Sequence, residues 1–130
     1  MDTIADFLTI IRNGVRETKS CVTAPMSSIK LEILKILKSE GFIVDYDIDN
    51  TDSIKKRLKI HLKYGPDNQS VIHEITQISK QSKRRYVKKR YIPKVMNGFG
   101  ICVLSTPKGL LTGRNARLAN IGGELLFQVW

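Results

Sequence analysis

Lysine, arginine and tyrosine side chains are concentrated in one segment, KQSKRRYVKKRYIPK, at residues 80–94. The segment holds eight basic residues with two tyrosines between them. Lys and Arg neutralise phosphates and release condensed counterions, and a tyrosine ring can stack on an unpaired base. These types and their spacing predict contact with RNA or DNA through side chains such as Arg84, Tyr86 and Lys88. The plainer alternative is an edge strand in which Tyr86 and Val87 point inward and the cations are merely solvated.

A second cluster, STPKG at residues 105–109, follows a stretch that we expect to be a buried strand. Such a strand holds the loop after it rigidly, which suits a recognition site. Ser105 and Thr106 carry hydroxyls that can meet base edges and ribose 2′-OH groups. Lys108 adds charge, and Gly109 lets a backbone approach closely. The cluster predicts a recognition loop for nucleic acid, and an ordinary turn is the alternative.

A third cluster is IGGELL at residues 121–126. Gly122 and Gly123 leave backbone N–H groups open ahead of an expected strand, and Glu124 stands in a basic neighbourhood. Glu124 has two open roles. In the functional role it accepts a hydrogen bond from a base amino group or orients an arginine. In the structural role it forms a buried ion pair with Arg84, Arg114 or Arg117.

Nothing in the chain predicts catalysis, a metal site or a cofactor. His61 and His73 have no nucleophile or carboxylate set at motif spacing, and no GxxxxGK[ST] loop is present. Cys21 and Cys102 stand alone, so neither belongs to a metal-type pair. We therefore expect no catalytic residue, no metal ligand and no small-molecule substrate. An enzyme such as a small nuclease would need clustered carboxylates or histidines near the basic half.

The net charge of the chain is +10, from 22 basic and 12 acidic residues among 130, and it is unevenly spread. Residues 1–65 carry a net charge of +2 and residues 66–130 carry +8. A polyanion is therefore the expected partner of the second half. A nucleic acid fits better than an anionic membrane, because the basic segment contains no amphipathic helix. No apolar run reaches the ~18–20 residues that span a bilayer, and the start shows no signal-peptide pattern.

The first half alternates helix and strand. Ile4, Phe7, Leu8 and Ile11 fall at helical spacing. The elements expected here are a helix over 3–16, a strand over 20–25, a helix from Ser27 or Ser28 to about residue 40, and a hairpin of strands 42–49 and 57–64 with a turn at 50–53. In the first hairpin strand the alternating set Phe42, Val44, Tyr46 and Ile48 is predicted to form the inner face.

A Gly-Pro-Asp-Asn break at residues 65–68 separates the halves. The first element expected after it is a strand over 71–79, with a helical start as the alternative. A central buried strand over 99–106, a loop over 107–113, a short helix over 114–119 and a closing strand over 124–130 follow. This order predicts the α+β class with two small subdomains packed together. The first, residues 1–65, is helix, strand, helix and hairpin, and the second, residues 66–130, is mainly antiparallel β with a short helix.

Several motifs together resemble one family. The chain opens on DTIADFLTIIRNG, has SEGFI near its centre, and then reads IPKVMNGFGICVLSTPKG, ARLANIGGELL and a final Trp130. In this order the motifs are similar to the bacterial- and plastid-type small-subunit ribosomal protein eight. The resemblance implies a non-enzymatic constituent of the small ribosomal subunit, in bacterial cytoplasm or plastid stroma. It also implies primary binding of an irregular stem in the central domain of small-subunit rRNA, support of subunit assembly and translation, and contacts with neighbouring small-subunit ribosomal proteins.

The resemblance also implies a set of RNA-binding residues. Those in the second half are Ser105, Thr106, Lys108, Gly109, Arg84, Tyr86, Gly122, Gly123 and Glu124. Those in the first half, which approach RNA less centrally, are Arg12, Asn13 and Lys30. The chain departs from the family at Pro107, where a polar residue is usual, and at Gln81-Ser82, where the family has Pro-Gly. A DNA-binding module and a purely protein-binding module remain the alternatives.

Overall fold

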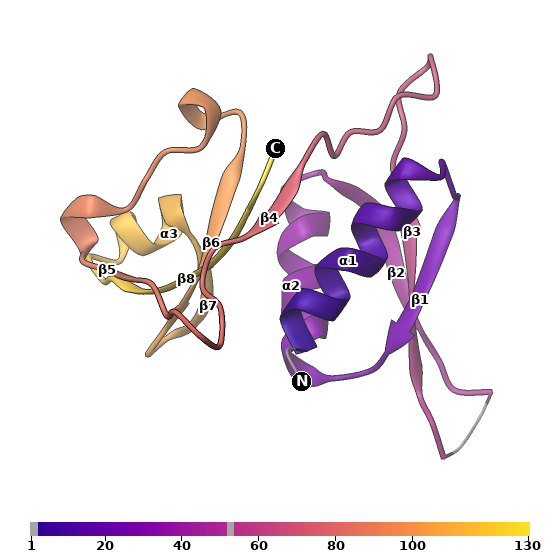
Figure 1. The fold of residues 1–130 in the computed structure, drawn as a ribbon, viewed down its shortest axis with the longest axis horizontal. Helices are drawn as coiled ribbons and strands as arrows, with labels where there is room; N and C mark the ends of the chain where they lie inside the picture. Colours follow the sequence, from indigo (N-terminus) through magenta and orange to yellow (C-terminus); the bar gives the residue numbers. More distant parts are fainter. Residues whose placement is uncertain (1–2, 52–53) are drawn as a thin grey trace. The chain divides into compact units, whose positions relative to one another are not determined.

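The computed structural model describes residues 3–51 and 54–130, and these form two compact units (Figure 1). The N-terminal unit is Asp6–Ile72, and the C-terminal unit is His73–Trp130 together with residues 3–5. Each unit has an antiparallel sheet of its own, with three and five strands respectively. The predicted α+β class is confirmed.

The N-terminal unit follows the predicted order of elements. They are α1 (Thr3–Arg16), β1 (Cys21–Pro25), α2 (Ser28–Ser39), β2 (Ile43–Asp49) and β3 (Arg57–Leu62). The first three residues of α1 are those grouped with the C-terminal unit. The sheet order is β1-β3-β2, and both helices lie on one side of it in Figure 1. The Ser27 hydroxyl caps α2 by accepting from the Lys30 N–H, and Gly41, at φ +83°, ends it. Asp52 and Ser53 of the predicted turn lie outside the described residues.

The predicted inner face of β2 is only partly right. Phe42, just before the strand, is buried, and Tyr46 and Ile48 stand opposite the buried residues Ile60 and Leu58 of β3, so they lie on the predicted face. The prediction is wrong at residues 43 and 44, since Val44 is 56% exposed and Ile43 is buried. The physical reason is a bulge, because the register with β3 shifts between Ile43 and Asp45. The bulge interrupts the alternation at Val44 and restores it from Tyr46 onward. Strand β2 is an edge strand, where a bulge is tolerated.

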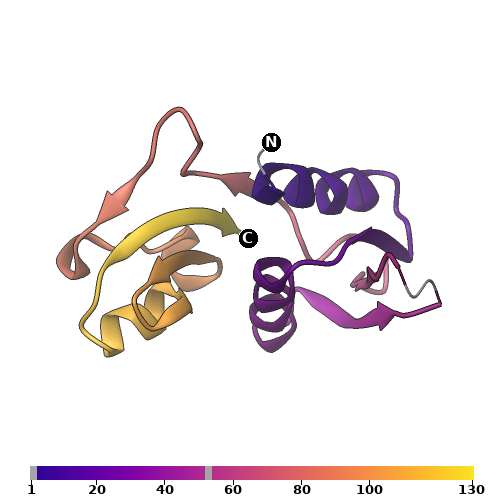
Figure 2. The same cartoon turned by 90° about the horizontal axis from the view of Figure 1, so that it is seen from below.

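Strand β8 is the centre of the C-terminal sheet. The elements of this unit are β4 (Ile75–Gln77), β5 (Tyr86–Val87), η1 (Lys89–Tyr91), η2 (Met96–Gly98), β6 (Ile101–Thr106), β7 (Gly109–Thr112), α3 (Gly113–Leu118) and β8 (Gly123–Val129). Strands β4 and β5 both pair with β8, which also pairs with β6, and β7 is the edge beyond β6. Figure 2 shows β8 as a long curved strand.

The loop predicted at 107–113 is wrong. Only Pro107 and Lys108 form a turn, and residues 109–112 return along β6 as β7, with Thr106 opposite Gly109. Gly109 has φ +98°, a conformation that favours glycine and lets so short a connection reverse the chain. The strand predicted at 71–79 is also shorter than expected, because only Ile75–Gln77 form β4.

A small apolar core joins strands β6 and β8 to helix α3 in the C-terminal unit. It consists of Ile92, Val95, Cys102, Leu104, Ala116 and Leu125. Residues of β6, β8 and α3 thus share one core, which fixes β6 as the buried strand that the sequence predicts. Burial raises the pKa of the Cys102 thiol, so this cysteine is a packing residue. In the described ranges no helix is long and apolar enough to cross a membrane.

Candidate nucleic-acid interface

Strand pairing brings the three predicted clusters into one row. Ser105 of β6 stands opposite Glu124 of β8, and Glu124 stands opposite Tyr86 of β5 on the other side. Directly paired residues project to the same face of a sheet. Side chains from positions 86, 105 and 124 therefore form a continuous line across three strands, which we call the cross-strand row.

The two ends of the cross-strand row are open to solvent. Tyr86 is 72% exposed, so it is not the inward residue that the plainer interpretation of the basic segment required. Ser105 is exposed too, and within residues 3–51 and 54–130 its hydroxyl has no hydrogen-bond partner. An exposed aromatic ring and an uncommitted hydroxyl on one face can stack on a base and bond its edge.

The neighbouring hydroxyl has a different role. The Thr106 hydroxyl donates to the Gly109 carbonyl, at 2.7 Å, and accepts from the Lys108 N–H, at 3.1 Å. These bonds close the β6–β7 turn and leave Pro107 and Lys108 exposed at its tip. Thr106 thus shapes the turn, and Ser105 is the hydroxyl that the turn leaves available.

Gly122 and Gly123 allow the three strands to approach one another closely. A Cβ at Gly123 would collide with the Ser105 carbonyl oxygen. A Cβ at Gly122 would collide with the Val87 carbonyl oxygen. The predicted importance of these glycines therefore has a steric reason in this structure, namely room for backbone.

Glu124, in the middle of the row, pairs with Arg84. The distance from Arg84 Nη1 to Glu124 Oε2 is 3.1 Å, and the Glu124 side chain is only 17% exposed. The alternative partner Arg117 instead donates to the Ile92 carbonyl, at 3.4 Å. The same Glu124 oxygen also accepts from the Ser79 hydroxyl. Sequence reasoning missed Ser79, since a serine 45 residues away carries no signal of this contact.

The remaining predicted residues lie elsewhere. Lys88 is exposed just after β5. Asn13 is exposed and Arg12 half-buried on α1 of the N-terminal unit. Lys30 is only 6% exposed, and its ammonium donates to the Pro25 carbonyl, at 2.9 Å. Burial also lowers the pKa of the Lys30 ammonium. Because this ammonium is enclosed and bonded to a backbone carbonyl, Lys30 has the geometry of a packing residue and not of an open phosphate contact.

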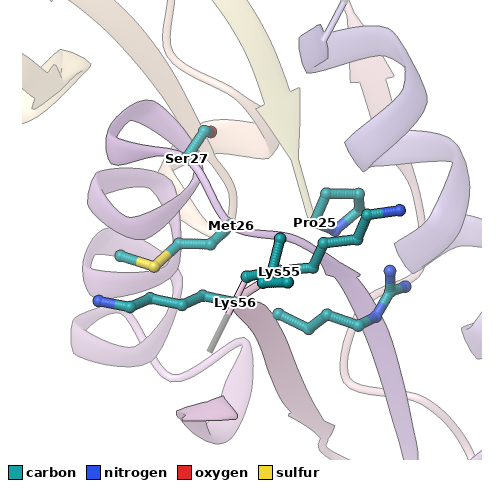
Figure 3. A pocket seen from close by; sticks show the side chains of 7 residues that line it. Pro25, Met26, Ser27, Lys55 and Lys56 are labelled. Atoms are coloured by element: carbon teal, nitrogen blue, oxygen red, sulfur yellow. The ribbon is translucent and has the colours of Figure 1, made fainter. Parts of the chain in front are cut away.

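A separate groove in the N-terminal unit has no residue in common with the predicted site. It is lined by Pro25, Met26, Ser27, Ile54, Lys55, Lys56 and Arg57. Figure 3 shows the Lys55 and Lys56 side chains extending in different directions, so the cations do not converge on one point. In the described part of the chain no cluster of His, Cys, Asp or Glu is suited to hold a metal ion.

Comparison with known proteins gives this geometry a family context. The family model described as ribosomal protein S8 matches residues 2–130, essentially the whole chain. The chain belongs to the ribosomal protein S8 family. The resemblance noted from the motifs is thereby confirmed, and with it the expectation of a non-enzymatic structural protein.

Individual relatives of the S8 family match over their full length. A protein of Thermus aquaticus named "Small ribosomal subunit protein uS8" is 49% identical, with 99% of this chain and 98% of the relative aligned. A protein of the same name from Streptococcus mutans is 48% identical, with 99% of this chain and 97% of the relative aligned. One from Koribacter versatilis is 43% identical, with 99% of this chain and 96% of the relative aligned.

Proposed function

We propose that this protein is a structural constituent of the small ribosomal subunit and a primary rRNA-binding protein. Its site is the cross-strand row together with the β6–β7 turn and the cations around them. Its RNA target is an irregular stem in the central domain of small-subunit rRNA. Binding there supports subunit assembly and translation on the ribosome, beside neighbouring small-subunit ribosomal proteins.

The observation that carries this proposal is the alignment of Ser105, Glu124 and Tyr86 across three strands. A row with a ring at one end and a hydroxyl at the other suits unpaired bases displayed by an irregular stem. The net charge of +8 on residues 66–130 supplies phosphate contacts, which position the RNA without reading its sequence. The uS8 name of the relatives supports the ribosomal setting.

The test is a filter-binding titration with a transcript of the central-domain stem and with an unrelated duplex of equal length. Ser105→Ala is expected to weaken stem binding by about tenfold, the loss of one well-placed hydrogen bond. Affinity for the unrelated duplex is expected to stay the same, because no charge changes. Tyr86→Ala should act in the same direction, since stacking contributes about 1–3 kcal/mol per base.

Ser20→Ala, at an exposed serine of the N-terminal unit, is the matched control and should change neither affinity. Equal binding of the stem by wild type and Ser105→Ala would overturn the assignment of the site. A preference for duplex DNA over structured RNA would instead favour the DNA-binding alternative.

A further inference from the structure

The chain between β4 and β5 is a short hairpin, residues 80–85, that we call the basic hairpin. Lys80 and Lys83 exchange two backbone hydrogen bonds of 3.0 Å, so the chain reverses through Gln81 and Ser82. All six residues are exposed, and four of them are Lys or Arg. The hairpin therefore presents cations directly beside Tyr86, and its tip, Gln81-Ser82, contains no proline to stiffen it.

A buried hydroxyl closes the base of the basic hairpin. Ser79 is 4% exposed. Its hydroxyl donates to the Glu124 carboxylate and accepts from the Arg85 N–H, at 3.2 Å. The Arg85 carbonyl in turn accepts from the Leu125 N–H of β8, at 2.8 Å. Both ends of the hairpin are thus fastened to β8, by backbone hydrogen bonds at Ser79 and Arg85 and by the side-chain bond from Ser79 to Glu124.

The two donors to Glu124 differ in how freely they can leave it. The Arg84 side chain is 51% exposed, so a phosphate can compete for its guanidinium. Ser79 is enclosed, and a hydrogen bond from an enclosed hydroxyl to a carboxylate is among the stronger ones. When RNA takes Arg84, the Ser79–Glu124 bond can therefore persist.

We infer that Ser79 is a positioning residue for RNA recognition: its hydrogen bond to Glu124, which we call the Ser79–Glu124 clamp, holds the basic hairpin and so positions Tyr86. The inference rests on the proposed function. Strand β5 pairs with β8 through only two residues, Tyr86 and Val87. The backbone bond from the Leu125 N–H to the Arg85 carbonyl holds the residue before Tyr86, and the Ser79–Glu124 clamp adds a side-chain constraint from the other end of the hairpin. Glu124 then contributes to specificity without touching a base.

The first test replaces Ser79 by alanine and measures binding to the central-domain stem and to an unrelated duplex, each at two salt concentrations. Because Ser79→Ala changes no charge, affinity for the unrelated duplex and its salt dependence should stay as in wild type. Affinity for the stem should fall by about tenfold. Ser70→Ala is the matched control: its hydroxyl also accepts a backbone N–H, from Ile72, at 3.1 Å, in the N-terminal unit.

The second test is Glu124→Gln, which keeps an oxygen that can accept from Ser79 but weakens the hold on Arg84. It should raise affinity for the unrelated duplex and steepen its salt dependence, because one more cation is available to phosphate. Stem affinity should fall less than in Ser79→Ala. If thermal unfolding shows that Ser79→Ala does not fold, the affinities of Glu124→Gln for the stem and the duplex test the inference instead.

The outcomes separate the two proposals. A folded Ser79→Ala protein that binds the stem like wild type overturns the positioning role and leaves the proposed function standing. An equal loss on both RNAs, or a Glu124→Gln protein with wild-type affinity for both, also overturns it. A wild-type protein that does not prefer the stem contradicts the proposed function itself.

Discussion

The adjacent hydroxyls of Ser105 and Thr106 have different roles at the β6–β7 turn. Thr106 accepts and donates within the turn, and Ser105 is left to solvent. A sequence pattern of Ser-Thr cannot distinguish these roles, because the difference lies in which hydroxyl points back at the Gly109 carbonyl.

Thr106→Val removes both hydrogen bonds of the turn hydroxyl, so it should lower the free energy of unfolding by about 1–2 kcal/mol. Ser105→Ala removes no internal hydrogen bond and should stay within about 0.5 kcal/mol of wild type. Urea denaturation of both variants measures this. Equal destabilisation by the two changes would contradict the division of roles.

Gly123→Ala places a methyl group against the Ser105 carbonyl oxygen. Backbone must shift to relieve the collision, so a loss of more than about 2 kcal/mol in unfolding free energy is expected. Gly65→Ala is the control, because the nearest atom to a Cβ there lies at 3.7 Å. We expect that variant to unfold within about 1 kcal/mol of wild type. Similar unfolding midpoints for both in urea would refute the steric role.

At the scale of elements, α2 is tied to β2 by an ion pair. Lys38 Nζ lies 3.0 Å from Asp45 Oδ1. The hydrogen bond from Lys38, and then the one from the Tyr46 N–H, hold the pKa of Asp45 below its ordinary 3.8. A carboxyl group with a lowered pKa stabilises the folded state above its unfolded-state pKa, and the contribution disappears as pH falls through the folded-state pKa.

Asp45→Asn should therefore be less stable than wild type at pH 7, and the difference should be smaller at pH 3, below the ordinary pKa of 3.8. The effect is small, because both side chains are half exposed. Thermal unfolding of the two proteins at both pH values provides the measurement. A stability difference that persists unchanged at pH 3 would show that the ion pair is not its source.

Local patterns were enough to predict most elements but not their edges. The spacing of Phe7, Leu8 and Ile11 and the Ser27 cap are local signals, so α1 and α2 were predicted nearly to the residue. Strand β7 was missed because it exists only by pairing with β6. The bulge in β2 was missed because a register shift depends on the partner strand, not on the alternation of its own residues.

At the scale of the whole molecule, the proposed function assigns general RNA affinity and RNA specificity to different residues. Lys88 and Lys89 are exposed next to β5 but lie outside the cross-strand row. Replacing both by alanine should weaken binding to every RNA alike. The slope of the logarithm of the binding constant against the logarithm of salt concentration should become shallower by the amount that about two phosphate contacts contribute. Titrations of stem and unrelated duplex at several salt concentrations test this. A loss confined to the stem would contradict the assignment of these lysines to general affinity.

The candidate site was predictable in its members but not in its geometry. Residues 84–88, 105–109 and 122–124 carry types and spacings that point to RNA, and the family resemblance selects the same segments. The alignment of Ser105, Glu124 and Tyr86 depends on the register of β5, β6 and β8 over long sequence distances. Burial of Lys30 depends likewise on packing that a single sequence does not display.

The most direct test of the central claim is chemical footprinting of protein-free small-subunit rRNA, with wild type and with Ser105→Ala at matched concentrations. We predict that wild type protects one irregular stem of the central domain, including its unpaired bases. The variant should lose protection of those bases while the flanking phosphates stay partly protected. Protection spread over the rRNA without a preferred stem, or an identical footprint from both proteins, would contradict the claim that the cross-strand row selects the RNA.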